Sequence, residues 1–297
     1  IVQYSIAIRS AAYLSCKHSQ LQIDRHEEGI ITVPIEDVGM ITIDHPAVAI
    51  TDRLITEISK NKASILCCGT NHIPEAIILP LVGNCRQNEL ISLQFNVKKP
   101  LQKQQWKSIV SAKIYNQSLC LEYLNLPFHS VRKLIDKIQS DDATNREAVA
   151  AQAYFKILIT DGSRRDSNWT PSLDYGYSII RSAIIQSLIA HGLMPSKGIH
   201  HNSIENAFNL ADDLIEPFRP VVDFYIASYK LNAELSHEIK VSLSKVLELC
   251  VHHNGRKISV RQSIDELIES LIRSMKEGDS SVLSCPSLLP IELITFE

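Results

Sequence analysis

The first third of the chain alternates between short apolar runs and polar breaks, which is typical of β-strands. The polar triplet Lys17-His18-Ser19 separates two of these runs and predicts a hairpin turn. Thr51 or Asp52 is suited to cap a short helix, and a buried strand is expected at residues 63–67. The other predicted strands cover residues 4–9, 12–16, 20–24, 30–35 and 40–43. The pattern therefore predicts a small β-rich domain at residues 1–83.

Beyond Asn84 the apolar residues recur at helical spacing, first through Leu90, Trp106 and Leu124. The Asn254-Gly255 dipeptide predicts a tight turn between the last two helices, and residues 278–286 have the composition of a loop. Further helices are predicted at residues 129–139, 144–159, 172–192, 203–229, 232–250 and 261–276. The predicted fold class is α+β, a small N-terminal β-rich domain followed by a larger all-α domain at residues 84–297.

The composition is that of a globular protein with a substantial core. Hydrophobic residues make up 45% of the 297 residues, and this length suffices for two domains. The longest apolar runs, such as residues 77–82, are far too short to cross a bilayer, and no charged-then-apolar leader is visible. We therefore expect a cytoplasmic protein without a membrane partner. The seven cysteines form no CxxC pair, which argues against a zinc ribbon, and no glycine-rich phosphate loop supports nucleotide hydrolysis.

The charge balance leaves nucleic-acid binding open. The net charge is −3, yet basic residues gather between Lys98 and Lys113 and again at Arg164 and Arg165. Each group, taken alone, is more typical of a solvated surface than of a track for phosphates. Arg219 lies between two prolines and is equally a candidate for an internal salt bridge with a nearby carboxylate.

A group of acidic and histidine residues offers candidate metal ligands. Asp213 and Glu216 are three residues apart, a spacing that puts both carboxylates on one face of a helix, and His201 precedes that helix. Two oxygens and one imidazole suit Mn²⁺, or Mg²⁺ with added waters. By spacing alone, a solvated carboxylate pair and a structural histidine are the commoner interpretation, and Pro217 disfavours regular helix at this point.

Several motifs carry a resemblance to a known family. The stretch Gly198-Ile199-His200-His201, followed by the run from Leu210 to Pro220, resembles the signature of the CRISPR-associated protein one family. The supporting motifs, in the family's order, are Val33-Pro34-Ile35-Glu36-Asp37-Val38, Pro74-Glu75-Ala76, Asn145-Arg146-Glu147-Ala148 and Leu173-Asp174-Tyr175-Gly176-Tyr177-Ser178. Their form is closest to members from type II systems. Asp174 stands where the family usually has Asn.

The resemblance implies a metal site made of Glu147, His201 and Glu216. The family histidine lies three residues after the turn glycine, which selects His201 over His200. Many members have Asp where this chain has Glu216, and Asp213 would be an additional acidic group near the metal. The expected cofactor is Mg²⁺ or Mn²⁺. Candidate phosphate contacts near this site are Arg164, Arg165 and Arg181, for which a solvated or helix-pairing role is equally expected.

The implied function is that of a metal-dependent DNA integrase and endonuclease of CRISPR adaptation. Such an enzyme joins a 3′-hydroxyl of a short foreign DNA, the spacer, to a phosphodiester of the CRISPR repeat. The implied partners are double-stranded DNA of the protospacer and the repeat, a second copy of the chain bound largely through the N-terminal domain, and the second CRISPR adaptation protein in a heterohexamer. Two alternatives stay open: a catalytically silent DNA-binding scaffold, and a transposon-encoded relative.

Overall fold

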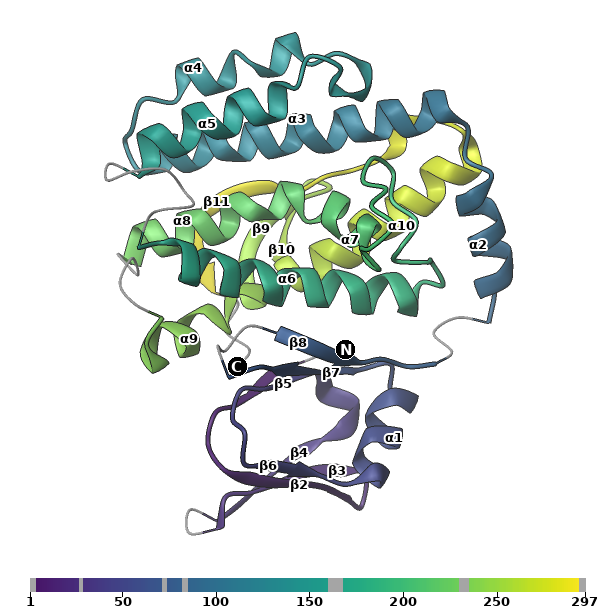
Figure 1. Ribbon diagram of the computed structural model, residues 1–297, viewed down its shortest axis with the longest axis vertical. Helices are drawn as coiled ribbons and strands as arrows, with labels where there is room; N and C mark the ends of the chain where they lie inside the picture. Colours follow the sequence, from purple (N-terminus) through teal and green to yellow (C-terminus); the bar gives the residue numbers. More distant parts are fainter. Residues whose placement is uncertain are drawn as a thin grey trace. The chain divides into compact units, whose positions relative to one another are not determined.

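The chain folds as two compact units, Ile1–Cys85 and Arg86–Glu297, in the computed structural model. The structure describes residues 4–26, 29–70, 74–81, 85–159, 168–229 and 235–293. The order of elements confirms the predicted α+β class, in which a β-rich region precedes a mainly helical one (Figure 1). Among the described residues, none of the helices has the length and apolar content needed to cross a bilayer.

The described residues of the first unit form two four-stranded sheets, one α-helix and a 3₁₀ turn at Ile35–Asp37. In one sheet β1, β5 and β7 run parallel and β8 pairs antiparallel with β7. In the other, β4, β3 and β2 are antiparallel and β6 runs parallel to β2. The strands are β1 Tyr4–Ile8, β2 Ala12–Lys17, β3 Gln20–Asp24, β4 Ile30–Pro34, β5 Val38–Ile43, β6 Val48–Ile50, β7 Ser64–Cys68 and β8 Pro74–Ile78. The strands predicted from alternation are thus confirmed.

The core of the first unit lies between its two sheets, which face each other (Figure 1). Leu14 and Leu21 from one sheet and Ile41 and Ile65 from the other are fully buried in a single cluster. Helix α1, Asp52–Lys60, packs on β2 and β7. The Thr51 side chain accepts a hydrogen bond from the Leu54 amide at the start of α1, as the predicted cap requires.

The second unit is built around the long helix α3, Lys99–Tyr123 (Figure 1). This helix packs against α5 (Arg146–Leu158), α8 (Arg219–Tyr229) and the strand β11 (Ser287–Leu293). The unit's other α-helices are α2 Gln87–Phe95, α4 His129–Arg132, α5 Arg146–Leu158, α6 Thr170–Ala190, α7 Asn209–Leu214, α8 Arg219–Tyr229, α9 His237–Leu243 and α10 Val260–Glu277. The helices predicted at residues 144–159, 172–192 and 261–276 are confirmed within two residues at each end.

The second unit is not all helical, which corrects the sequence prediction. Strands β9, Leu249–His253, β10, Arg256–Ser259, and β11, Ser287–Leu293, form an antiparallel sheet in the order β10-β9-β11. The predicted Asn254-Gly255 turn is present, with φ of 50° and 76°, but it joins two strands rather than two helices. The apolar run at residues 247–251 fits the period of a helix as well as that of a strand. The segment becomes a strand because β9 pairs with a neighbouring strand on each side.

Three predicted helices are broken. The segment predicted as one helix at 203–229 is a loop to residue 208, followed by α7, a 3₁₀ turn at Glu216–Phe218 and α8. The loop forms because the side chains of Asn206 and Asn209 bind nearby backbone groups that a helix would otherwise use. The helix predicted at 129–139 breaks after Arg132. In the described part of the segment predicted at 232–250, α9 is followed by a 3₁₀ turn at Val246–Glu248 and then by the strand β9.

Helices α6 and α8 approach closely at Gly176, and this contact yields a first prediction. A Cβ added at Gly176 would lie 2.5 Å from Val222 Cγ1, and the β-branched valine has little freedom to rotate away. We expect Gly176→Ala to destabilise the protein by about 1–3 kcal/mol through overpacking. Unfolding in urea measures this loss.

Val222→Ala supplies the matched control. Because the new methyl would occupy the space that the valine vacates, the double variant should lose less stability than the sum of the two single variants. Additive losses would show that the destabilisation does not come from this contact.

Candidate functional site

Glu147 is placed by the start of helix α5. Asn145, at the N-terminal end of the helix, has a left-handed backbone conformation with a φ of 51°. The chain therefore turns sharply into the helix at this residue. The side chain of Asp142 accepts hydrogen bonds from the amides of Arg146, at 2.7 Å, and Glu147, at 2.9 Å. These amides have no partner within the helix, so the carboxylate fixes the first turn. Asp142 is a supporting residue that the sequence analysis did not identify.

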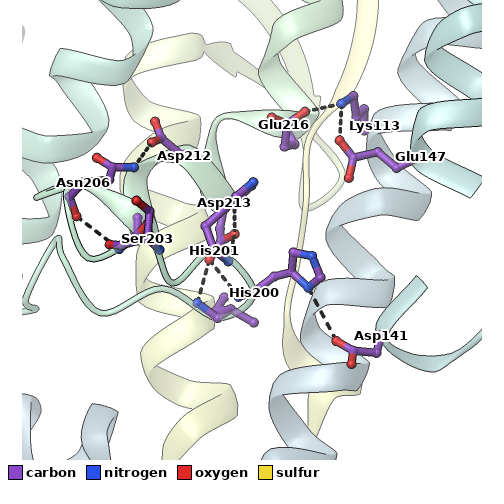
Figure 2. A network of polar contacts seen from close by, with 12 residues as sticks. Lys113, Asp141, Glu147, His200, His201, Ser203, Asn206, Asp212, Asp213 and Glu216 are labelled. Carbon is purple, nitrogen blue, oxygen red and sulfur yellow. Dashed lines mark hydrogen bonds and ion pairs between the residues drawn. The ribbon is translucent and has the colours of Figure 1, made fainter. Parts of the chain in front are cut away.

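Lys113 joins two of the predicted ligands. Its Nζ donates to Glu147 Oε1 at 2.6 Å and forms a second ion pair with Glu216 Oε2 (Figure 2). The side chains of Lys113 and Glu216 are only 9% and 5% exposed. Two carboxylates from different helices thus share one buried cation. The sequence analysis had counted Lys113 in a basic stretch typical of a solvated surface, which the structure shows to be wrong for this residue.

The buried Glu216 is balanced by a second cation. Arg219 Nε donates to Glu216 Oε1 at 2.8 Å, and the Arg219 guanidinium lies over the Tyr177 ring at 4.8 Å. Burial by itself raises the pKa of the Glu216 carboxyl, but Arg219 and Lys113 outweigh burial and lower its pKa to about 2. Likewise, burial lowers the pKa of Lys113, but Glu216 and Glu147 outweigh that effect and raise it. The salt-bridge role expected for Arg219 is confirmed.

Asp213 organises the loop that carries both histidines. Its fully buried carboxylate accepts hydrogen bonds from the amides of Ile199, His200 and His201 at 2.6, 3.0 and 3.1 Å. Gly198 allows this close approach, because a Cβ there would lie 2.2 Å from the His201 carbonyl oxygen and 2.9 Å from Asp213 Oδ2. The Gly-x-x-His spacing therefore has a steric cause.

The ring of His201 is oriented by the same carboxylate. His201 Nδ1 lies 2.6 Å from Asp213 Oδ1, and a carboxylate accepts, so the ring proton belongs on Nδ1 (Figure 2). Nε2 then carries the lone pair that a metal binds, the arrangement common for metal-ligating histidines. The hydrogen bond to Asp213 raises the pKa of His201 despite partial burial. The side chain is 44% exposed and accessible from solvent.

His200 points elsewhere. Its ring stacks on the buried Trp106 with centroids 4.4 Å apart and planes within 3°, and its Nδ1 lies 3.5 Å from Asp141. Trp106 also meets His201 edge-on at 5.7 Å. Trp106 thus acts as a core residue that supports both rings. The loop is held further by Gln94, which bonds the backbone of Met194 and Lys197.

Of the three arginines predicted as phosphate contacts, the structure describes Arg181. Arg181 pairs with Asp212 through two hydrogen bonds of 2.5 and 3.1 Å and lies over the Phe208 ring. Its guanidinium therefore has an internal partner, although it also lines a pocket beside the site. Arg164 and Arg165 lie outside the described residues. The pocket lined by Arg181 has a volume of about 330 Å³, and its lining also includes His201, Glu216, Arg219 and Asp174.

The predicted ligands lie in one neighbourhood without closing around a single point. Glu147 and Glu216 meet at Lys113, while His201 lines the same pocket as Glu216 and contacts Asp213 (Figure 2). Within the described segments, no three His, Cys, Asp or Glu side chains are close enough together to hold a metal ion. The donor set still fits a hard divalent cation, because both carboxylates already contact one shared positive charge.

Comparisons with known proteins identify the family. The sequence model of the family described as CRISPR associated protein Cas1 matches residues 6–262. The chain is 33% identical to the CRISPR-associated endonuclease Cas1 of Neisseria meningitidis serogroup C (strain 8013), and the match covers 99% of both chains. It is 22% identical to a CRISPR-associated endonuclease Cas1 of Saccharolobus solfataricus, over 89% of this chain and 88% of the relative.

Solved structures share the fold. A CAS1 protein from Thermotoga maritima superposes with a TM-score of 0.72 at 17% identity, covering 93% of this chain and 98% of that one. A casposase bound to integration product superposes with a TM-score of 0.75, also at 17% identity, covering 95% of this chain and 93% of that one. The family match along most of the sequence confirms the resemblance that the motifs carry, and this chain belongs to the CRISPR-associated protein Cas1 family.

Proposed function

We propose that this chain is a metal-dependent DNA integrase and endonuclease of CRISPR adaptation, which inserts short foreign DNA into the CRISPR array. The observation that carries the proposal is the meeting of Glu147 and Glu216 on one cation, beside a histidine whose ring is held by Asp213. The family's curated relatives bear the name endonuclease, and this supports a nuclease chemistry for the same site.

Glu147, Glu216 and His201 Nε2 would hold Mg²⁺ or Mn²⁺. Such an ion, when bound, supplies Lewis acidity that lowers the pKa of a 3′-hydroxyl or a water and neutralises charge on the attacked phosphate. In the proposed reaction a new phosphorus–oxygen bond forms to the 3′-hydroxyl of the spacer while the bond to the 3′-oxygen of the repeat strand breaks. The proton of the attacking hydroxyl ends on that leaving oxygen. Water in place of the hydroxyl gives hydrolysis.

The chain's own residues prepare this chemistry. Asp213 fixes the His201 ring with Nε2 available, so no rotation is needed when a ligand arrives. Arg219 holds Glu216 in its ionised form at the wall of a pocket of about 330 Å³. Arg181, also at that wall, is proposed to contact a DNA phosphate through donors not used by Asp212, and Arg164 and Arg165 are proposed to do the same.

The partners of the assembly are proposed by similarity. One structural neighbour is a casposase bound to integration product, and another is a Cas6-RT-Cas1–Cas2 complex with a TM-score of 0.73. We infer that this chain binds double-stranded protospacer and repeat DNA in the cytoplasm. It would do so as a homodimer, through the domain at residues 1–83, within a heterohexamer that includes the second adaptation protein.

Two alternatives have specific support. A catalytically silent DNA-binding scaffold would also account for the ion pairs of Lys113 with both carboxylates, because these pairs balance the charges without a metal. The fold of a casposase favours a transposon-encoded relative that joins its own element ends. Strand transfer in the absence of the second adaptation protein, with substrates that lack a CRISPR repeat, would favour the transposon alternative.

The first test of the enzyme is resolution of a branched DNA that mimics a half-integrated spacer. We expect His201→Ala to lower the rate in Mn²⁺ by about 100-fold or more, because a ligand is lost, and chelation by EDTA to abolish it. His252→Ala, which removes an exposed histidine of β9, should react at the wild-type rate. The rate is measured by gel analysis of labelled strands.

Full activity of His201→Ala would contradict the ligand assignment and direct attention to His200. Binding of the branched DNA without reaction by any of the proteins would favour the scaffold.

A third prediction concerns the support of the His201 ring by Asp213. Asp213→Asn retains the shape of the side chain but removes the charge that orients the ring, and we expect Mn²⁺ affinity to fall about 10- to 100-fold. Asp212→Asn is the matched neighbour, whose carboxylate pairs with Arg181 rather than with His201, and should weaken Mn²⁺ binding much less. Isothermal titration calorimetry of both variants measures the difference. Equal losses would argue that Asp213 has no particular link to the metal.

A further inference from the structure

Lys113 holds the position between the two proposed carboxylate ligands. We propose that Lys113 is an internal counter-cation, which balances Glu147 and Glu216 in the metal-free protein and which a divalent metal displaces on binding. This inference rests on the proposed function, in which the same two carboxylates are ligands. Lys113 then sets how readily the site takes a metal, without being a ligand itself.

The position of Lys113 is built by helix packing. The residue lies inside α3, which packs against α5, the helix of Glu147, and against the 3₁₀ turn at Glu216–Phe218. Its side chain is 9% exposed, and its Nζ reaches a carboxylate oxygen of each partner, at 2.6 Å for Glu147. A side chain with this degree of burial and two carboxylate partners is not a surface lysine that happens to lie nearby.

The two carboxylates depend on Lys113 to different degrees. Glu216 also pairs with Arg219 through its other oxygen, Oε1, at 2.8 Å. Within the described part of the chain, the ion pair found for Glu147 is the one with Lys113. A metal that takes the place of the ammonium therefore leaves the Arg219 pair in position and changes the partner of Glu147.

The charge count explains why displacement is required. Two carboxylates brought to one point repel each other unless a cation lies between them, and burial of Glu216 makes that repulsion stronger than in water. The ammonium of Lys113 removes the repulsion when no metal is present. A divalent ion supplies twice that charge, but it cannot share the position with an ammonium without a new repulsion, so the two cations compete.

Competition between Lys113 and the metal predicts the direction in which the Mn²⁺ affinity changes when the lysine is removed. Lys113→Met removes the competing cation and leaves the metal-free carboxylates unbalanced, so the metal-free protein is destabilised while the metal-bound form is not. The affinity for Mn²⁺ should therefore rise, by about tenfold or more. Lys156→Met on α5 is the matched control, because it removes the same charge from an exposed position, and its affinity should equal that of the wild type.

The experiment is calorimetric titration of the full chain with Mn²⁺ alone, combined with thermal unfolding in EDTA and in Mn²⁺. We expect Lys113→Met to melt below the wild type in EDTA, to bind Mn²⁺ more tightly and to show the larger upward shift in Tm. A variant that folds only with Mn²⁺ would give the same support. Wild-type or weaker affinity in a folded Lys113→Met would overturn the inference.

Lys113→Arg keeps the test decisive if the methionine variant does not fold. Its charge is retained, and a guanidinium that donates to both carboxylates at once is harder to displace, so Mn²⁺ affinity should fall several-fold below the wild type. Wild-type affinity of Lys113→Arg would overturn the inference. Absence of Mn²⁺ binding by the wild type would instead reject the proposed metal site itself, and the inference with it.

Discussion

The buried carboxylate of Asp213 is the constraint on which the site depends. It accepts hydrogen bonds from three consecutive backbone amides and from the ring of His201. One side chain thus provides the hydrogen bonds that regular secondary structure would otherwise supply to the loop at residues 198–201. Such a group is costly to bury unless each of its acceptors is used, and here the loop satisfies them. The histidine is thereby fixed to α7, an element that also leads directly to Glu216.

A second constraint is the balance of charge beyond α7. Glu147 and Glu216 contribute two negative charges to a region where Lys113 and Arg219 contribute two positive ones. The cluster is neutral without any ion, which lets helices α3, α5 and α8 pack around it. A divalent ion that displaces the ammonium of Lys113 would leave the cluster with excess positive charge, because Glu147, Glu216 and Arg219 together carry a single negative charge. Anionic DNA is the partner that such a charged site favours, so metal binding and phosphate binding should assist each other.

Much of this organisation could be predicted from the sequence, and the exceptions have physical causes. The amphipathic helix α10 shows a clear period, and the Gly198-to-Pro220 motifs indicate the family. Lys113 could not be placed, because its contact with Glu147 spans 34 residues and depends on how α3 packs. The hairpin at residues 249–259 was missed because the apolar run at residues 247–251, which includes the start of β9, fits a helix as well as a strand, and only strand pairing decides.

The relation between Asp213 and Glu216 shows how a correct spacing can support an incomplete interpretation. Three residues apart, they were expected to share one helical face and one cation. Helix α7 instead ends at Leu214, and Pro217 follows in a 3₁₀ turn. Asp213 therefore points to His201 while Glu216 points to Lys113. Because Pro217 interrupts the helix, one short acidic motif provides both the support of the histidine and a proposed ligand. A continuous helix would direct both carboxylates to the same place and leave the histidine loop without its anchor.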